Sequence, residues 1–119
     1  MKAQSRPAVA AIAAALANGK AYGAVYDHAA GGYVRITARV VQGRVEAYDH
    51  QGAFAIGGPL PDRVFNHGEQ AYLTFGLVEG RVEGFDYKSN AHYSATVTGD
   101  RVDLYDYESS AYHQFSVAD

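Results

Sequence analysis

The sequence predicts an α+β protein in which an N-terminal α-helix packs on a strongly curved antiparallel β-meander of about 8-10 strands, with a half-barrel or barrel-like shape. Three observations support this prediction. A hairpin unit recurs at a near-constant period, the turns between its strands contain the residues that two-residue β-turns favour, and an alanine-rich segment precedes the first strand. With 119 residues, the chain is expected to form a single domain, residues 1-119.

The repeat is clearest in the second half of the chain. Residues 80–87 read Gly-Arg-Val-Glu-Gly-Phe-Asp-Tyr, and residues 100–107 repeat this pattern as Asp-Arg-Val-Asp-Leu-Tyr-Asp-Tyr. Residues 43–50 form an earlier copy, and residues 62–67 form a degraded one. A fixed period of this length is typical of a supersecondary unit that packs against its own copies. We therefore expect a sheet of repeated hairpins over about residues 21-117.

The turns predict which residues face each other across the hairpins. If Gln42-Gly43, Glu79-Gly80 and Gly99-Asp100 are two-residue turns, three apolar pairs follow. These pairs are Val40 with Val45, Leu77 with Val82, and Val97 with Val102. At the opposite ends, four-residue loops such as 88–91 are expected to join the strands and to place Tyr87 opposite His92. The alternation then gives one apolar face and one face rich in tyrosine.

The first 18 residues allow two interpretations. A basic start followed by an apolar run that ends in Ala15-Leu16-Ala17 suggests an export signal. The larger side chains of the run instead recur at helical spacing on one face: Val9, Ile12 and Leu16. Ser5 is a candidate N-cap and Gly19 a candidate C-terminal stop. We expect a retained amphipathic helix over about residues 6-18 and a cytoplasmic protein; the alternative is an exported protein that loses residues 1-17.

Composition excludes several classes of function. The absence of cysteine excludes a disulfide framework, thiol catalysis and cysteine-ligated metal sites. The net charge is −3 and the ten Lys and Arg residues are dispersed, so no nucleic acid partner is expected. The five histidines lack metal-ligand spacing, so no metal is expected. No other cofactor is expected either, because the sequence has no Gly-rich phosphate loop and no Walker-type motif. No apolar run is long enough for a membrane span as a helix.

The tyrosine-rich face supplies the candidate binding residues. They are Tyr72, Tyr87, His92, Tyr105, Tyr107 and Tyr112. Such rings could stack on a glycan, on a flat ligand or on a protein partner, because each has an apolar face and a polar tip. The other interpretation is that cross-strand aromatic pairs only stabilise a half-exposed sheet. A homodimer through this face is a further possibility.

A second row, at the rim of the apolar face, suggests an alternative site. Its residues are Asp86, Tyr93, Asp106 and His113. Asp106 is expected opposite His113, where it could charge the imidazole, and the Tyr93 hydroxyl could bridge the two aspartates. However, an aspartate follows an aromatic residue just before a loop in four copies of the unit, at positions 27, 49, 86 and 106. This recurrence favours a turn-forming role for the carboxylate.

The Gly-Arg-Val-Glu-x-Tyr-Asp-His/Tyr unit resembles other short tandem hairpin repeats built on glycine and tyrosine, of the kind found in MORN-type proteins. It lacks their Tyr-x-Gly-x-Trp core. The chain is also similar to small uncharacterised bacterial proteins. The resemblance implies a repetitive antiparallel sheet and no particular chemistry.

Together these observations predict a non-enzymatic binding or protein-interaction module with an unknown protein or glycan partner. The alternatives are a small-ligand or enzymatic pocket at the rim around Asp106 and His113, and a structural protein that self-associates through its aromatic face.

Overall fold

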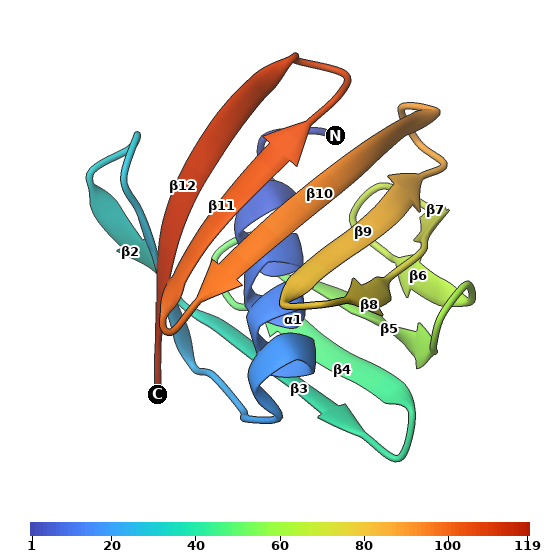
Figure 1. The fold of residues 1–119 in the computed structure, drawn as a ribbon, viewed down its shortest axis with the longest axis horizontal. Coiled ribbons are helices and arrows are strands. Elements are labelled where there is room, and N and C mark those ends of the chain that lie inside the picture. Colours follow the sequence, from blue (N-terminus) through green and yellow to red (C-terminus); the bar gives the residue numbers. More distant parts are fainter.

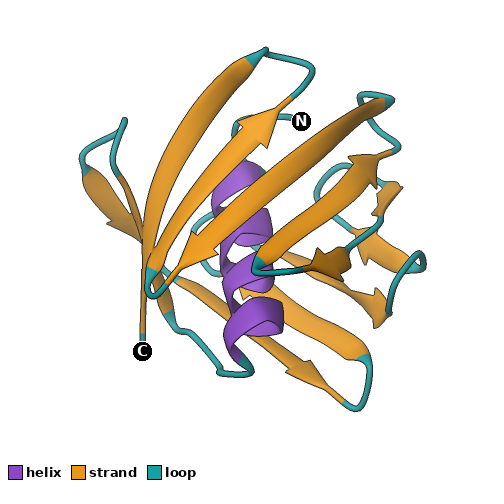
Figure 2. Cartoon of the chain, viewed as in Figure 1, coloured by secondary structure: helices purple, strands orange, loops and turns teal.

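The computed structural model describes residues 1–119 and consists of one helix enclosed by a single antiparallel sheet (Figures 1 and 2). Its elements are α1 (Arg6–Asn18), β1 (Ala24–Asp27), β2 (Gly32–Val34), β3 (Ile36–Val41), β4 (Arg44–Asp49), β5 (Phe54–Pro59), β6 (Val64–Asn66), β7 (Ala71–Leu73), β8 (Gly76–Val78), β9 (Arg81–Asp86), β10 (Ala91–Thr98), β11 (Arg101–Asp106) and β12 (Ala111–Ala118). The strand order is β2-β1-β12-β11-β10-β9-β7-β6-β5-β4-β3, and β8 pairs with β9.

One backbone bridge joins the two ends of this sheet. The N–H of Tyr22, just before β1, donates to the carbonyl of Ala38 on β3, and the N–H of Ala38 donates back, both at 2.9 Å. The strands β2 and β3 meet at Arg35 but pair with different neighbours, β1 and β4, so β2 projects from the wall of the sheet (Figure 1). The result is a nearly closed, barrel-like sheet with extents of 31 × 31 × 30 Å.

The helix α1 is the centre of the core. Every residue from Pro7 to Ala15 is buried, and α1 contacts strands from both halves of the sheet. Because most of these side chains are alanine methyl groups, strands can approach the helix from all sides, and larger residues such as Ile36, Leu104 and Phe115 fill the remaining space. The predicted helix bounds are confirmed. The prediction of an amphipathic helix is wrong, since this helix has no solvated face along those residues.

The ends of α1 explain its length. Gly19 adopts the left-handed conformation with φ 62°, and its N–H donates to the carbonyl of Ala15, which ends the helix as the sequence predicts. At the other end, Ser5 makes no side-chain cap; its hydroxyl instead accepts from the Asn66 amide at 2.9 Å. The helix is not long enough to span a membrane, and no other helix is present.

The α+β prediction is wrong, because the fold is mainly β. Twelve strands surround a single helix of 13 residues, which forms a core rather than a layer beside the sheet. The expected strand number was too low because two predicted strands each divide, one at Arg35 and one at Thr74-Phe75. At the second division, the Tyr93 hydroxyl donates to the Thr74 carbonyl at 2.6 Å, above Gly84, which leaves the space for this contact.

The register was predicted in part. The pairs Val40–Val45, Leu77–Val82 and Val97–Val102 are all confirmed. At the other ends of the strands, where the loop after β9 was predicted at residues 88–91, the pairing is wrong by two residues. The loop starts one residue earlier, which places Phe85, not Tyr87, opposite His92. A shift of two residues keeps each side chain on the same face of the sheet, so it does not change which residues belong to the apolar face and which to the tyrosine-rich face. Leu77 is nevertheless 51% exposed, because β8 lies off the main path of the sheet.

Candidate functional site

Each hairpin unit ends in the same turn. An Asp or Asn side-chain oxygen accepts a hydrogen bond from the backbone N–H two residues later, at 2.9–3.0 Å. The residues that accept are Asp27, Asp49, Asn66, Asp86 and Asp106, and we name the five copies of the unit after them. The fourth residue after each of these has a φ between 54° and 72°. The turn-forming role of the carboxylate is therefore confirmed in all four aspartate copies.

Clusters of aromatic rings cover the outer surface of the barrel next to these turns. The aromatic residue just before the turn-forming Asp or Asn is the central ring, and it packs edge-to-face against two others. One belongs to the residue just after the Asp or Asn, and the other faces the central ring across the hairpin. The ring centroids are 4.8–5.0 Å apart. We call each set an aromatic trio. The four complete trios are Tyr26, His28 and Tyr33; Phe65, His67 and Tyr72; Phe85, Tyr87 and His92; and Tyr105, Tyr107 and Tyr112.

All six predicted binding residues belong to three of these trios. Four of them are strongly exposed: Tyr72 at 48%, Tyr87 at 54%, Tyr107 at 57% and Tyr112 at 69%. The structure thus gathers the predicted residues on the exterior of the sheet, where they also pack on one another. Their ring pairs stabilise the outer surface, and their role as ligand contacts stays a prediction.

Two depressions lie on the outer face of β9, β10, β11 and β12, each next to Tyr107. One, of about 510 Å³, includes Glu83 and His92, and the other, of about 440 Å³, includes Arg81 and Tyr112. Ser94 and Tyr107 line both, so the two form a continuous surface. The side chains of Arg81 and Glu83 are themselves paired at 2.7 Å. This surface combines exposed rings, small hydroxyl side chains and one ion pair.

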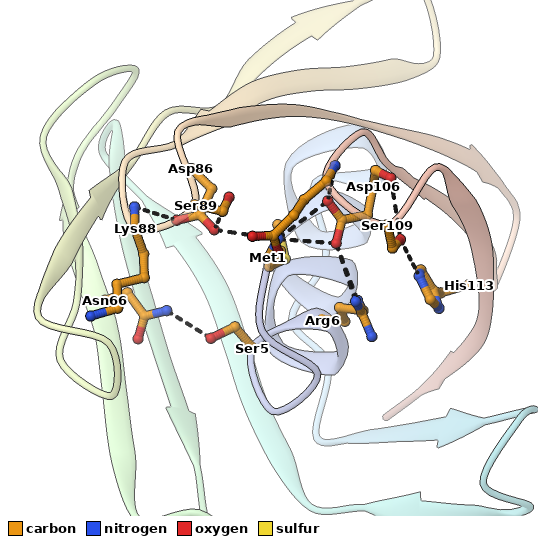
Figure 3. A network of polar contacts seen from close by, with 11 residues as sticks. Met1, Ser5, Arg6, Asn66, Asp86, Lys88, Ser89, Asp106, Ser109 and His113 are labelled. Carbon is orange, nitrogen blue, oxygen red and sulfur yellow. Dashed lines mark hydrogen bonds and ion pairs between the residues drawn. The ribbon is translucent and has the colours of Figure 1, made fainter.

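The alternative site at the rim is a network of ion pairs (Figure 3). The amino group of Met1 lies 3.0 Å from a carboxylate oxygen of Asp106, 3.7 Å from Asp86 and 2.6 Å from Glu108, and the Arg6 guanidinium lies 3.3 Å from Asp106. Burial alone would lower the pKa of the Met1 amine, but hydrogen bonds and charges from Glu108 and Asp106 outweigh burial and raise this pKa above 8.0. The rim carboxylates are therefore compensated by two cations.

The other two rim residues do not join the aspartates as predicted. His113 faces Leu104, while Asp106 faces Ala111, so the predicted Asp106–His113 pair is wrong. The His113 Nε2 lies 3.1 Å from the Ser109 hydroxyl instead. Burial lowers the pKa of His113 from 6.5, and the charge of Arg6 lowers it further, against an opposing effect of Asp106.

Tyr93 also differs from its predicted role. Its hydroxyl donates to the Thr74 carbonyl, and it does not bridge the aspartates. Burial raises the pKa of this phenol well above its usual range, and the nearby charge of Asp86 raises it further. The cation between Asp86 and Asp106 is the Met1 amine, which sequence reasoning missed because no local pattern indicates that the chain start lies beside two distant turns.

No protein-family model, curated protein or solved structure matches this chain. The resemblance to MORN-type repeats therefore stays an expectation. No group of three or more His, Cys, Asp or Glu side chains is arranged to hold a metal ion.

Proposed function

We propose that this protein is a non-enzymatic binding module that holds a glycan on the outer face of β9–β12. The observation that carries the proposal is the continuous depression around Tyr107, which both of the hollows on this face share. Three other predicted binding residues line it: His92, Tyr105 and Tyr112.

The chemistry of this surface suits a sugar better than an apolar ligand. A pyranose ring has C–H faces that pack against aromatic rings and hydroxyl groups that need both donors and acceptors. The exposed rings of Tyr107 and Tyr112 offer the first kind of contact. Ser94, Thr96 and the Arg81–Glu83 pair, all of which line the depression, offer the second. The depression is shallow, so we expect a Kd of about 1 mM for a single sugar and tighter binding for an oligosaccharide.

A glycan array, followed by NMR titration of the best oligosaccharide, tests the proposal. Tyr107→Ser is expected to weaken binding at least tenfold, since this residue lines both hollows. Tyr33→Ser is the matched control, because Tyr33 is 68% exposed in a complete trio but lies on β2, outside the depression. If no glycan binds, or if both variants bind as the parent does, the glycan proposal fails. A dimer that Tyr107→Ser dissociates would favour the self-associating protein instead.

We also propose that residues 1–17 are retained and that the protein is cytoplasmic. The buried helix supports retention, because cleavage after Ala17 would remove the core residues 7–15. A mass measurement on the native protein checks this: a chain that begins after Ala17 would contradict the proposal.

A further inference from the structure

One of the five hairpin units lacks its third aromatic ring. Across the hairpin, Tyr48 faces Ala55, whereas the equivalent positions in the other units hold a ring. Those rings are Tyr33, Tyr72, His92 and Tyr112, each directly opposite the central ring of its trio. Tyr48 consequently has one aromatic neighbour, His50 at 4.9 Å, where every other central ring has two.

The missing ring leaves a hollow on the outer surface of the sheet. A concavity of about 750 Å³ lies over β3, β4 and β5, and Ala55, Gly57 and Gly58 are the small residues of β5 that line it. Tyr48 on β4 and His67 after β6 also line it, and they flank Ala55 on its two sides. Since neighbouring strands lie about 4.8 Å apart, the backbones that carry these two rings are ~9.6 Å apart. The hollow therefore contains a slot one strand wide, which in the other units a ring occupies.

The side chains around the slot are held elsewhere and do not fill it. The Tyr48 ring packs on His50, and the His67 ring packs on Phe65 at 4.8 Å. Beyond Gly57, the guanidinium of Arg39 is paired with Glu46 at 2.7 Å. These fixed partners give the slot two aromatic walls and a polar end.

We propose that this slot binds the phenol ring of a ligand, which takes the place of the missing third ring against Tyr48. The third ring is a tyrosine in three of the four complete trios, so a phenol is the ring that best fits this position. Its hydroxyl can exchange hydrogen bonds with the Arg39–Glu46 pair, which lines the concavity next to Gly57. The ring belongs either to a tyrosine of a partner peptide or to a free small phenol. This site is independent of the glycan face, because the two surfaces share no residue.

Titration of the ¹⁵N-labelled protein with p-cresol and with N-acetyl-tyrosinamide tests the proposal, and cyclohexanol serves as the non-aromatic control. The amides of Ala55 and Gly57 should shift, with a Kd of about 1 mM for p-cresol. Ala55→Tyr should complete the trio and weaken p-cresol binding at least tenfold, whereas Ala55→Ser should change it less than twofold. Binding of the tyrosinamide as well indicates a peptide ligand; binding of p-cresol alone indicates a small phenol.

A second variant tests the same idea at another unit. Tyr72→Ala should open an equivalent slot between Phe65 and Tyr87 and create a second p-cresol site with shifts at the mutated position. The proposal is overturned if p-cresol causes no shift at Ala55 and Gly57 up to about 10 mM. It is also overturned if cyclohexanol binds equally well, if a folded Ala55→Tyr protein binds p-cresol as the parent does, or if Tyr72→Ala gains no site.

Discussion

Two copies of one turn, at Asp27 and at Asp106, have the same local geometry and different surroundings. In both, a carboxylate oxygen accepts the N–H two residues later at 3.0 Å. Asp27 makes no ion pair, and its turn lies at the surface, whereas Asp106 is 1% exposed and contacts the Met1 amine and Arg6. The local motif thus sets the turn, and its position around the barrel decides whether the same carboxylate also fixes the N-terminal segment.

The difference matters for the whole fold because the N-terminal segment is the core. Arg6 is the first residue of α1, and Met1 lies five residues before it. Contacts from Asp106 to both residues hold the start of the helix at one rim of the barrel (Figure 3). The Asp106 copy therefore links a surface turn to the central helix, and the Asp27 copy does not.

The largest effect is expected from removal of each carboxylate. Asp106→Ala leaves Arg6 without its carboxylate partner and leaves the Met1 amine with Glu108 and the more distant Asp86, and it should lower the free energy of unfolding by about 3 kcal/mol. Asp27→Ala removes only the turn hydrogen bonds and should lower it by about 1 kcal/mol. Urea denaturation of the two variants measures both values. Similar decreases in the free energy of unfolding for the two variants would show that the ion pairs of Asp106 do not contribute to stability.

A smaller effect is expected at the guanidinium partner. Arg6→Gln removes two contacts to Asp106 and should lower the free energy of unfolding by about 1–2 kcal/mol. In a protein that already carries Asp106→Ala, Arg6→Gln should lower the free energy of unfolding much less, because the partner carboxylate is already absent. A double-mutant cycle in urea measures this coupling. An additive cycle would contradict a direct Arg6–Asp106 interaction, and Asp27→Ala with Arg6→Gln is the additive control.

The Met1 amine predicts a loss of stability at alkaline pH. Its pKa is raised in the folded protein above the ordinary 8.0, so the folded state binds this proton more tightly than the unfolded state. The contribution is fully present below pH 8.0 and is lost as the pH rises through the folded pKa. Urea midpoints between pH 7 and pH 10 should fall for the parent and for Asp27→Ala. They should fall less for Asp106→Ala, and an equal fall in all three would contradict this assignment.

The smallest effect is expected from His113 at mildly acidic pH. Its folded pKa lies below 6.5, so the unfolded state binds this proton more tightly. The contribution is present above pH 6.5 and is lost as the pH falls through the folded pKa. Comparing the parent with His113→Gln between pH 5 and pH 7 isolates the effect, and the variant should have the flatter profile. Identical profiles would assign the acid sensitivity to other groups.

Local sequence signals predicted the turns and faces well. The glycine-containing dipeptides at residues 42–43 and 79–80 fixed the hairpin register, because few residues tolerate the left-handed conformation that both positions adopt. The recurring aspartate correctly indicated a turn. The repeat also indicated the copy at residues 62–67, in which Asn66 forms the turn. The missing ring at Ala55 was not predicted, because it becomes apparent only when Tyr48 is known to face Ala55.

Long-range features could not be predicted in the same way. Nothing near Asp106 in the sequence distinguishes it from Asp27, because the cations that it contacts come from residues 1 and 6. The helix looked amphipathic since alanine is compatible with both burial and exposure, and only closure of the sheet decides between them. That closure depends on the single bridge between Tyr22 and Ala38, which no hairpin turn specifies.

The most direct measurement compares Asp106→Asn with Asp27→Asn in urea at pH 7. Asparagine can keep the turn, as Asn66 does with the same hydrogen bond at 3.0 Å, so these variants preserve the turn while they remove the charge and one acceptor oxygen. We predict that Asp27→Asn changes the free energy of unfolding by less than about 0.5 kcal/mol and that Asp106→Asn lowers it by about 2–3 kcal/mol. Equal values for the two variants would contradict the conclusion that Asp106 anchors the N-terminal segment through its charge.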